Sequence, residues 1–198
     1  MDIIKKTNGQ YLNKEEFYKR LKLLELDLNL FSKLINISLD TIDTWDDELN
    51  PIPTKVVIWL IDFEYKIKIK TLQKEFIKIY KTKKWDFEAH HQAMYDFVIH
   101  KKRFIEFKIS DYEIVVKIGN KDLGFKHFIL RHYGIGSDGE IKALDILKVG
   151  NVIKNEIIIP SKGKDKMTFI QIKNDTKYTV ILKKDKSGKL LFNFFSNK

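Results

Sequence analysis

Apolar residues recur every three or four positions through the first third of the chain, which predicts a series of short helices. Asn13 is placed to cap the first helix, a second is expected over residues 28–34, and Ser38 is placed to cap a third over residues 38–48. A longer helical pattern then runs over residues 54–81. The first part of the chain is therefore predicted to be all-helical.

The pattern changes to near-alternation after residue 102. Residues 104–109 and 112–118 have the β-rich composition and alternation of strands. Asp122 is expected to cap a helix that ends at His132, and a further helix is expected over residues 141–152. The apolar residues 157–159 follow, and then three more strands are predicted, over residues 167–173, 177–184 and 189–195, the last two joined by a hairpin turn.

These elements predict an α+β protein in two parts. Residues 1–84 form the helical module, and residues 85–198 form a small α+β domain with an antiparallel sheet. The polar run 81–84 is the expected junction. Residues 85–101 are predicted to add one helix, with these residues turned inward: Trp85, Ala89, Ala93 and Phe97, and Met94 as a further candidate.

One stretch of the helical module has the pattern of a known DNA-binding motif. Residues 29–38, followed by residues 41–45, fit "F-x-x-L-x-x-I-S-x-x-T-I-x-x-W", and this stretch resembles a phage-repressor-type helix-turn-helix covering about residues 13–65. The presumed recognition helix, residues 38–48, carries only acidic charges: Asp40, Asp43, Asp46, Asp47 and Glu48. Because carboxylates repel DNA phosphates, the sequence favours dimerisation or partner docking over DNA binding.

Composition and charge further restrict the kind of partner and the location that the protein can have. Residues 1–80 contain equal numbers of basic and acidic side chains, so the net charge of +10 is carried by the rest of the chain. A basic domain of this kind suits a nucleic-acid partner. The chain has no cysteine, no pattern of a signal peptide and no apolar run long enough to span a membrane, so a cytoplasmic location is expected.

The basic half contains one segment with two histidines, His127 and His132. On a helix they lie about 140° apart, which disfavours a shared metal, and no other cluster suggests a metal site or a cofactor. Cleavage of RNA without metal needs only a base, a cation and an acid, because the 2′-hydroxyl of the RNA is the nucleophile.

This segment also resembles a known group of enzymes. Residues 124–134 look like the "G-F-x-H-I-x-x-x-H" helix of phage-associated nuclease-like domains of the barnase, EndoU, colicin and RelE-like superfamily, and the likeness extends over about residues 102–198. The resemblance implies a helix and a four-stranded sheet that cleave RNA without metal, often as a toxin. It places His127 and His132 on the two motif histidines and Tyr178 or Thr179 on the catalytic strand, with Ser196 as a weak match to a terminal motif.

The resemblance and the basic charge together select the residues of the candidate site. The candidate catalytic residues are His127, Arg131, His132, Tyr178 and Thr179, and the candidate nucleic-acid contacts are Lys126, Lys162, Lys164, Lys166 and Lys183.

Other polar motifs carry no expected chemistry. His90, His91 and His100 are expected at the surface, because their spacing supplies no partner. Gly134, Gly136 and Gly139 match the letters of a dinucleotide motif but follow a helix instead of a strand, which excludes that interpretation.

The sequence therefore predicts a metal-independent, toxin-like endoribonuclease with an N-terminal recruitment or dimerisation module. Its expected partners are RNA, an acidic antitoxin or inhibitor, and a second copy of the chain. The alternative is a non-enzymatic DNA-binding regulator or partner-binding protein of phage or toxin–antitoxin origin.

Overall fold

A computed structural model describes residues 12–82, 86–136, 138–154, 157–160, 165–185 and 188–197. The chain forms two compact units, Met1–Glu64 (unit 1) and Tyr65–Lys198 (unit 2). The division falls inside a long helix, whereas the sequence placed the junction at residues 81–84. Leu72 and Phe76, from the second half of that helix, are fully buried in the core of unit 2. The boundary between the units therefore lies nearer the N-terminus than residues 81–84.

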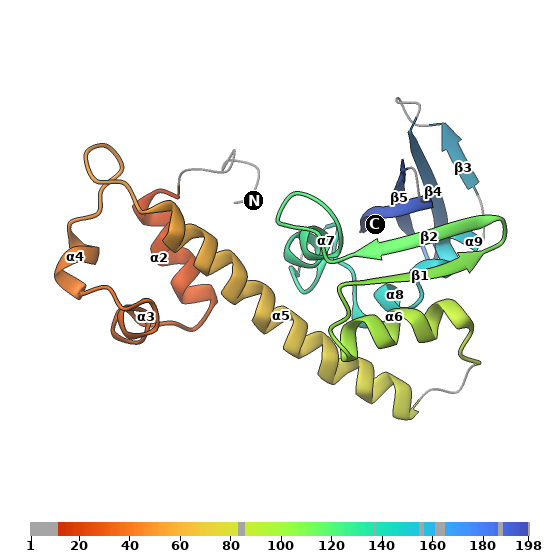
Figure 1. The fold of residues 1–198 in the computed structure, drawn as a ribbon, viewed down its shortest axis with the longest axis horizontal. Coiled ribbons are helices and arrows are strands. Elements are labelled where there is room, and N and C mark those ends of the chain that lie inside the picture. Colours follow the sequence, from red (N-terminus) through yellow and green to blue (C-terminus); the bar gives the residue numbers. More distant parts are fainter. Residues whose placement is uncertain are drawn as a thin grey trace. The chain divides into compact units, whose positions relative to one another are not determined.

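Unit 1 is helical, with α2 (Lys14–Leu23), α3 (Leu28–Ile35), α4 (Leu39–Asp43) and the first part of α5 (Thr54–Thr82) (Figure 1). The predicted caps are present: the side chain of Asn13 accepts a hydrogen bond from the Glu16 amide, and that of Ser38 accepts one from the Thr41 amide. Asn36 ends α3 in the left-handed conformation, with φ of 54°.

The core of unit 1 is aromatic. The ring of Phe17 packs edge-on against Phe31 and Trp45, with centroid distances of 5.2 and 5.5 Å. The predicted third helix is shorter than expected, because Asp46 accepts hydrogen bonds from the amides of Glu48, Leu49 and Asn50 and folds that segment into a turn.

Unit 2 combines helices with one sheet (Figure 1). Its elements after α5 are α6 (Ala89–Ile99), β1 (Phe104–Ile109), β2 (Tyr112–Lys117), α7 (Phe125–His132), α8 (Ala143–Leu147), α9 (Val149–Lys154), β3 (Ile157–Pro160), β4 (Lys166–Lys173), β5 (Thr176–Asp185) and β6 (Gly188–Asn197). The predicted α+β class is confirmed.

The described strands form one sheet in the order β1-β2-β6-β5-β4-β3. All neighbours are antiparallel except β2 and β6, which pair in parallel through Val115 and Leu190. The last strand therefore lies inside the sheet and joins the β1–β2 hairpin to the β3–β4–β5 meander.

The helices of unit 2 share a core with one face of the sheet. Phe169, Val180 and Phe194 are directly paired in the register, are fully buried and belong to this core, together with residues of α5 to α9. Since side chains alternate along a strand, Thr179 and Phe195 lie on the other face. We call this the outer face.

Two helix predictions need correction. The helix that ends at His132 is capped by Gly124 and not by Asp122, because the backbone of residues 119–124 turns tightly with positive φ at both glycines. The helix predicted over residues 141–152 is two short helices, α8 and α9, separated at Lys148. Within the described part of the chain, no helix is both long and apolar enough to cross a membrane.

Candidate functional site

Helix α7 carries the histidine segment and is fixed by its apolar side. Phe125, Phe128 and Ile129 are buried in the core of unit 2. At its start, a Cβ atom on Gly124 would lie 2.9 Å from the carbonyl oxygen of Lys117, so only glycine lets the strand turn into the helix here. The polar side of α7 is thereby left for other contacts.

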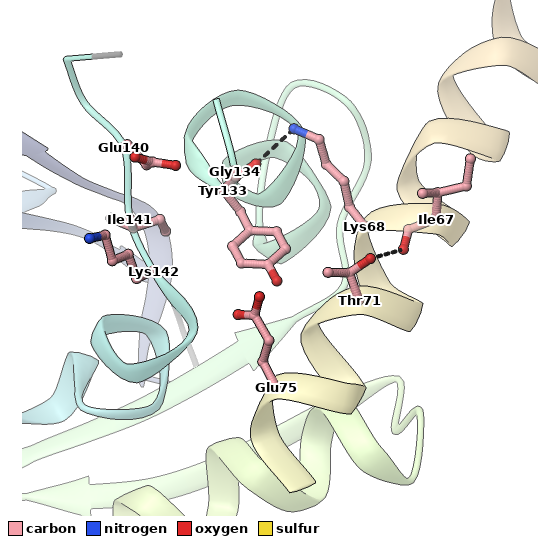
Figure 2. Close-up of a pocket in the computed structure, with 9 residues that line it drawn as sticks. All are labelled: Ile67, Lys68, Thr71, Glu75, Tyr133, Gly134, Glu140, Ile141 and Lys142. Atoms are coloured by element: carbon pink, nitrogen blue, oxygen red, sulfur yellow. Dashed lines mark hydrogen bonds between the residues drawn. The ribbon is translucent and has the colours of Figure 1, made fainter. Parts of the chain in front are cut away.

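The end of α7 is held by a lysine from α5. Nζ of Lys68 donates hydrogen bonds to the carbonyl oxygens of Leu130 (3.1 Å) and Tyr133 (2.9 Å), and Figure 2 shows the side chain reaching across to this end of the helix. A cation is favourable at a helix C-terminus, where the carbonyls have no partner within the helix.

The imidazole of His132 lies against β6. It stacks on the ring of Phe195, with a centroid distance of 5.6 Å and an interplanar angle of 30°. The following loop keeps it there: the Ile141 amide bonds to the carbonyl of His132, and the Ser196 hydroxyl donates to the carbonyl of Glu140. A Cβ atom on Gly139 would lie 3.5 Å from Nδ1 of His132, so this loop approaches the ring closely.

On the outer face, the strand partner of Phe195 is one of the two strand candidates. Phe195 is directly opposite Thr179 in the β5–β6 register, and Thr179 is only 5% exposed. Two of the predicted lysines, Lys166 and Lys183, are exposed and directly opposite each other on the same face, four residues along β5 from Thr179. The separation is about 13 Å at the usual rise of a strand.

The other strand candidate faces away from this group. Tyr178 pairs with Ser196 on the helix-covered side of the sheet. Burial and the neighbouring Asp145 raise the pKa of its phenol. The structure thus separates Tyr178 from Thr179, which the sequence offered as alternatives.

The second motif histidine is held at the opposite end of α7. Nδ1 of His127 donates to the carbonyl oxygen of Lys121 at 2.7 Å. Burial lowers the pKa of His127, and the nearby charge of Arg131 lowers it further against the opposing effect of that hydrogen bond. His127 and His132 are therefore not brought together.

The remaining candidates are dispersed. Arg131 is partly buried, and its Nε has no hydrogen-bond partner among the described residues. Nζ of Lys126 lies 5.4 Å from the ring centroid of Tyr65. Lys162 and Lys164 lie outside the described residues.

Beside the end of α7 is a pocket of about 350 Å³ that the sequence did not indicate. Figure 2 shows the Tyr133 hydroxyl pointing toward the carboxylate of Glu75 inside it. Burial, followed by the charge of Glu75, raises the pKa of Tyr133. The pocket is lined by Ile67, Lys68, Thr71, Glu75, Tyr133, Gly134, Glu140, Ile141 and Lys142. Both signs of charge occur, so it has no marked preference for anions.

The prediction that His90 and His91 lie at the surface is wrong. They are 4% and 2% exposed, because the amide oxygen of Asn151 on α9 lies 2.9 and 3.0 Å from their two Nε2 atoms and satisfies both rings inside the core. In the sequence, the only signal of this cluster is the pair of adjacent histidines. His100 is exposed, as predicted, and its Nε2 lies 3.8 Å from Asp96.

Helix α4 keeps the acidic character seen in the sequence. Asp40 and Asp43 are exposed on it, and Asp47 and Glu48 are exposed in the turn that follows. The side-chain caps and buried Trp45 support a compact helical unit, while the exposed carboxylates give it a surface unsuited to DNA phosphates.

Comparison with known proteins adds no relative: no family model, no curated protein and no solved structure matches this chain.

Proposed function

We propose that the protein is a metal-independent, toxin-like endoribonuclease of the cytoplasm that acts through the outer face of unit 2. The observation that carries this proposal is the placement of His132, which is held by the loop after α7 and stacks on Phe195, the strand partner of Thr179. A fixed imidazole at the edge of a face that also carries lysines has the groups needed for transesterification of RNA.

In the proposed reaction, His132 takes the proton of the 2′-hydroxyl while that oxygen attacks the adjacent phosphorus. The bond from phosphorus to the 5′-oxygen breaks, and solvent supplies the proton to the leaving oxygen. The products carry a 2′,3′-cyclic phosphate and a 5′-hydroxyl. Lys166 and Lys183 contact phosphates along the strand, and the buried Thr179 positions Phe195 beneath the imidazole.

Paired lysines support an anionic ligand on this face. Lys166 and Lys183 place two exposed positive charges directly opposite each other, which favours a ligand with negative charge. An acidic antitoxin that paired with the same lysines would block the binding of RNA.

Unit 1 is proposed to recruit a partner protein or to form a dimer, and not to bind DNA. Leu30 and Leu34, one turn apart on α3, are 44% and 46% exposed, and the carboxylates of α4 follow them in the chain. Sedimentation of the full chain with Leu30→Ser and Leu34→Ser would test dimerisation through these residues.

The central test is incubation of the full chain with total RNA and transfer RNA in EDTA, with the product ends mapped. We expect cyclic-phosphate fragments that His132→Gln abolishes and that His127→Gln, at the other end of α7, largely retains. Intact RNA after any bound partner has been stripped, or unchanged cleavage by His132→Gln, would contradict the proposal. RNA binding without cleavage would favour the non-enzymatic alternative.

A further inference from the structure

A second cluster of reactive side chains lies where α6 begins. His90 and His91 occupy its first turn, and Glu88 is the residue that precedes the helix. One potential ligand atom of each of these three side chains lies within 4.8 Å of those of the other two. Adjacent histidines do not have the usual spacing of metal ligands on a helix, so no metal site was predicted here from the sequence.

The hydrogen bonds fix which ring nitrogen is available. Both Nε2 atoms face the Oδ1 of Asn151, which accepts, so each ring carries its proton on Nε2. The Nδ1 atoms then hold the lone pairs: that of His91 accepts from the Glu88 amide at 3.0 Å, and that of His90 lies 3.8 Å from Oε2 of Glu88. Metal-binding histidines are commonly oriented in this way, by donating their other N–H to an oxygen.

We propose that His90 and His91, through their Nδ1 atoms, and Glu88, through a carboxylate oxygen, bind a divalent transition-metal ion such as Zn²⁺. Two imidazoles and one carboxylate are a typical ligand set for zinc, with a fourth position left to water. Tetrahedral ligands at about 2 Å from the ion lie roughly 3.3 Å apart, so the His90–Glu88 pair must close by only about half an ångström.

The surroundings also leave the site accessible. The Glu88 side chain is 45% exposed, which gives the ion access from solvent although both rings are buried.

One contact opposes the ion. Nζ of Lys154 bonds to Oε2 of Glu88 at 2.9 Å and competes for the carboxylate. Because the lysine side chain is about half exposed, it can swing into solvent. Binding also exchanges the bond between the Glu88 amide and His91 for a metal ligand. The ion would then tie the start of α6 to α9 through Asn151.

The test is calorimetric titration of Zn²⁺ into the EDTA-treated, dialysed full chain, with Co²⁺ absorption reporting the ligands. We expect one ion per chain, binding at least tenfold weaker in Glu88→Gln, and binding several-fold tighter in Lys154→Met. His100→Gln is the matched control, since it removes an exposed histidine 3.8 Å from a carboxylate on the same helix.

Equal Zn²⁺ affinity in Glu88→Gln and the parent chain would overturn the proposal, as would loss of binding in His100→Gln. The exposed Glu88 and Lys154 variants keep the test decisive even where substitution of a buried histidine impairs folding. Because RNA cleavage is assayed in EDTA, failure of the zinc site leaves the ribonuclease proposal untouched, and the reverse holds equally.

Discussion

Nζ of Lys68 lies 2.9 Å from the carbonyl oxygen of Tyr133. The bond joins α5 to the end of the helix that carries His132, and the same ammonium also reaches the carbonyl of Leu130. A residue more than 60 positions away in the sequence therefore completes the terminus beside the candidate site.

Replacing this lysine should loosen the terminus. Lys68→Met removes charged hydrogen bonds from partly buried carbonyls, so we expect the free energy of unfolding to fall by about 1.5–3 kcal/mol. Urea denaturation of the full chain measures the change. Lys74→Met, at an exposed position of the same helix, is the control, and an equal effect of both variants would show that the cap contributes nothing.

The lysine pair of the outer face should control how salt affects RNA binding. If Lys166 and Lys183 contact phosphates, each Gln substitution lowers the slope of log K against log salt by about 0.7 for single-stranded RNA. Titration of a non-cleavable oligonucleotide at several salt concentrations gives this slope. Lys74→Gln should leave it unchanged; slopes identical in all variants would place the RNA elsewhere.

Gly150→Ala should destabilise the protein, although alanine usually favours a helix. The added Cβ would lie 2.3 Å from Cδ2 of His90, a distance that no relaxed structure tolerates. We expect a loss of about 1–3 kcal/mol in thermal or urea unfolding. His90→Ala in the same chain should make Gly150→Ala less costly, and strictly additive losses would argue against this contact.

Acid should destabilise the fold through the buried histidines. Burial and the neighbouring His90 hold the pKa of His91 at about 4, below the value of about 6.5 for an exposed histidine. The unfolded chain therefore binds more protons between these two pH values. The free energy of unfolding should fall as the pH drops through this window, by at most about 1.4 kcal/mol per pH unit for one histidine.

Unfolding in urea at pH 7.5 and pH 5 measures this dependence. Glu88, Lys148 and Lys154 are the charged groups that act on the pair, and their combined effect is included in the lowered pKa values. His91→Gln should flatten the pH dependence more than His100→Gln does. An equal dependence in both variants would mean that His91 is not held neutral.

Features set by neighbouring residues could be predicted from the sequence. The caps at Asn13 and Ser38 and the β5–β6 hairpin depend on short-range bonding, and the structure contains all three. The buried side of α6 was harder to predict. Met94 and Phe97 are buried as expected, but Ala89 is exposed, because the histidine pair bonded to Asn151 takes the inward positions. Trp85 lies outside the described residues.

The candidate site likewise depends on contacts between residues that are far apart in the sequence. His132 could be singled out by its motif, but its stacking on Phe195 depends on a strand that follows more than 50 residues later. The alternation of side chains makes Tyr178 and Thr179 face opposite sides, yet only the register and the helices show which side is covered. Long-range pairing, including the parallel β2–β6 contact, has no local signal.

The position of β6 has a consequence for how the protein is made. The strand of Val115 gains its second neighbour only when Leu190, 75 positions later, has been synthesised, so the sheet cannot close before then. Until then β2 and β5 expose unpaired edges that invite aggregation or chaperone binding. Since Phe195 belongs to this late strand, the surface beneath His132 is also assembled last, which delays any RNA cleavage until translation of these residues is complete.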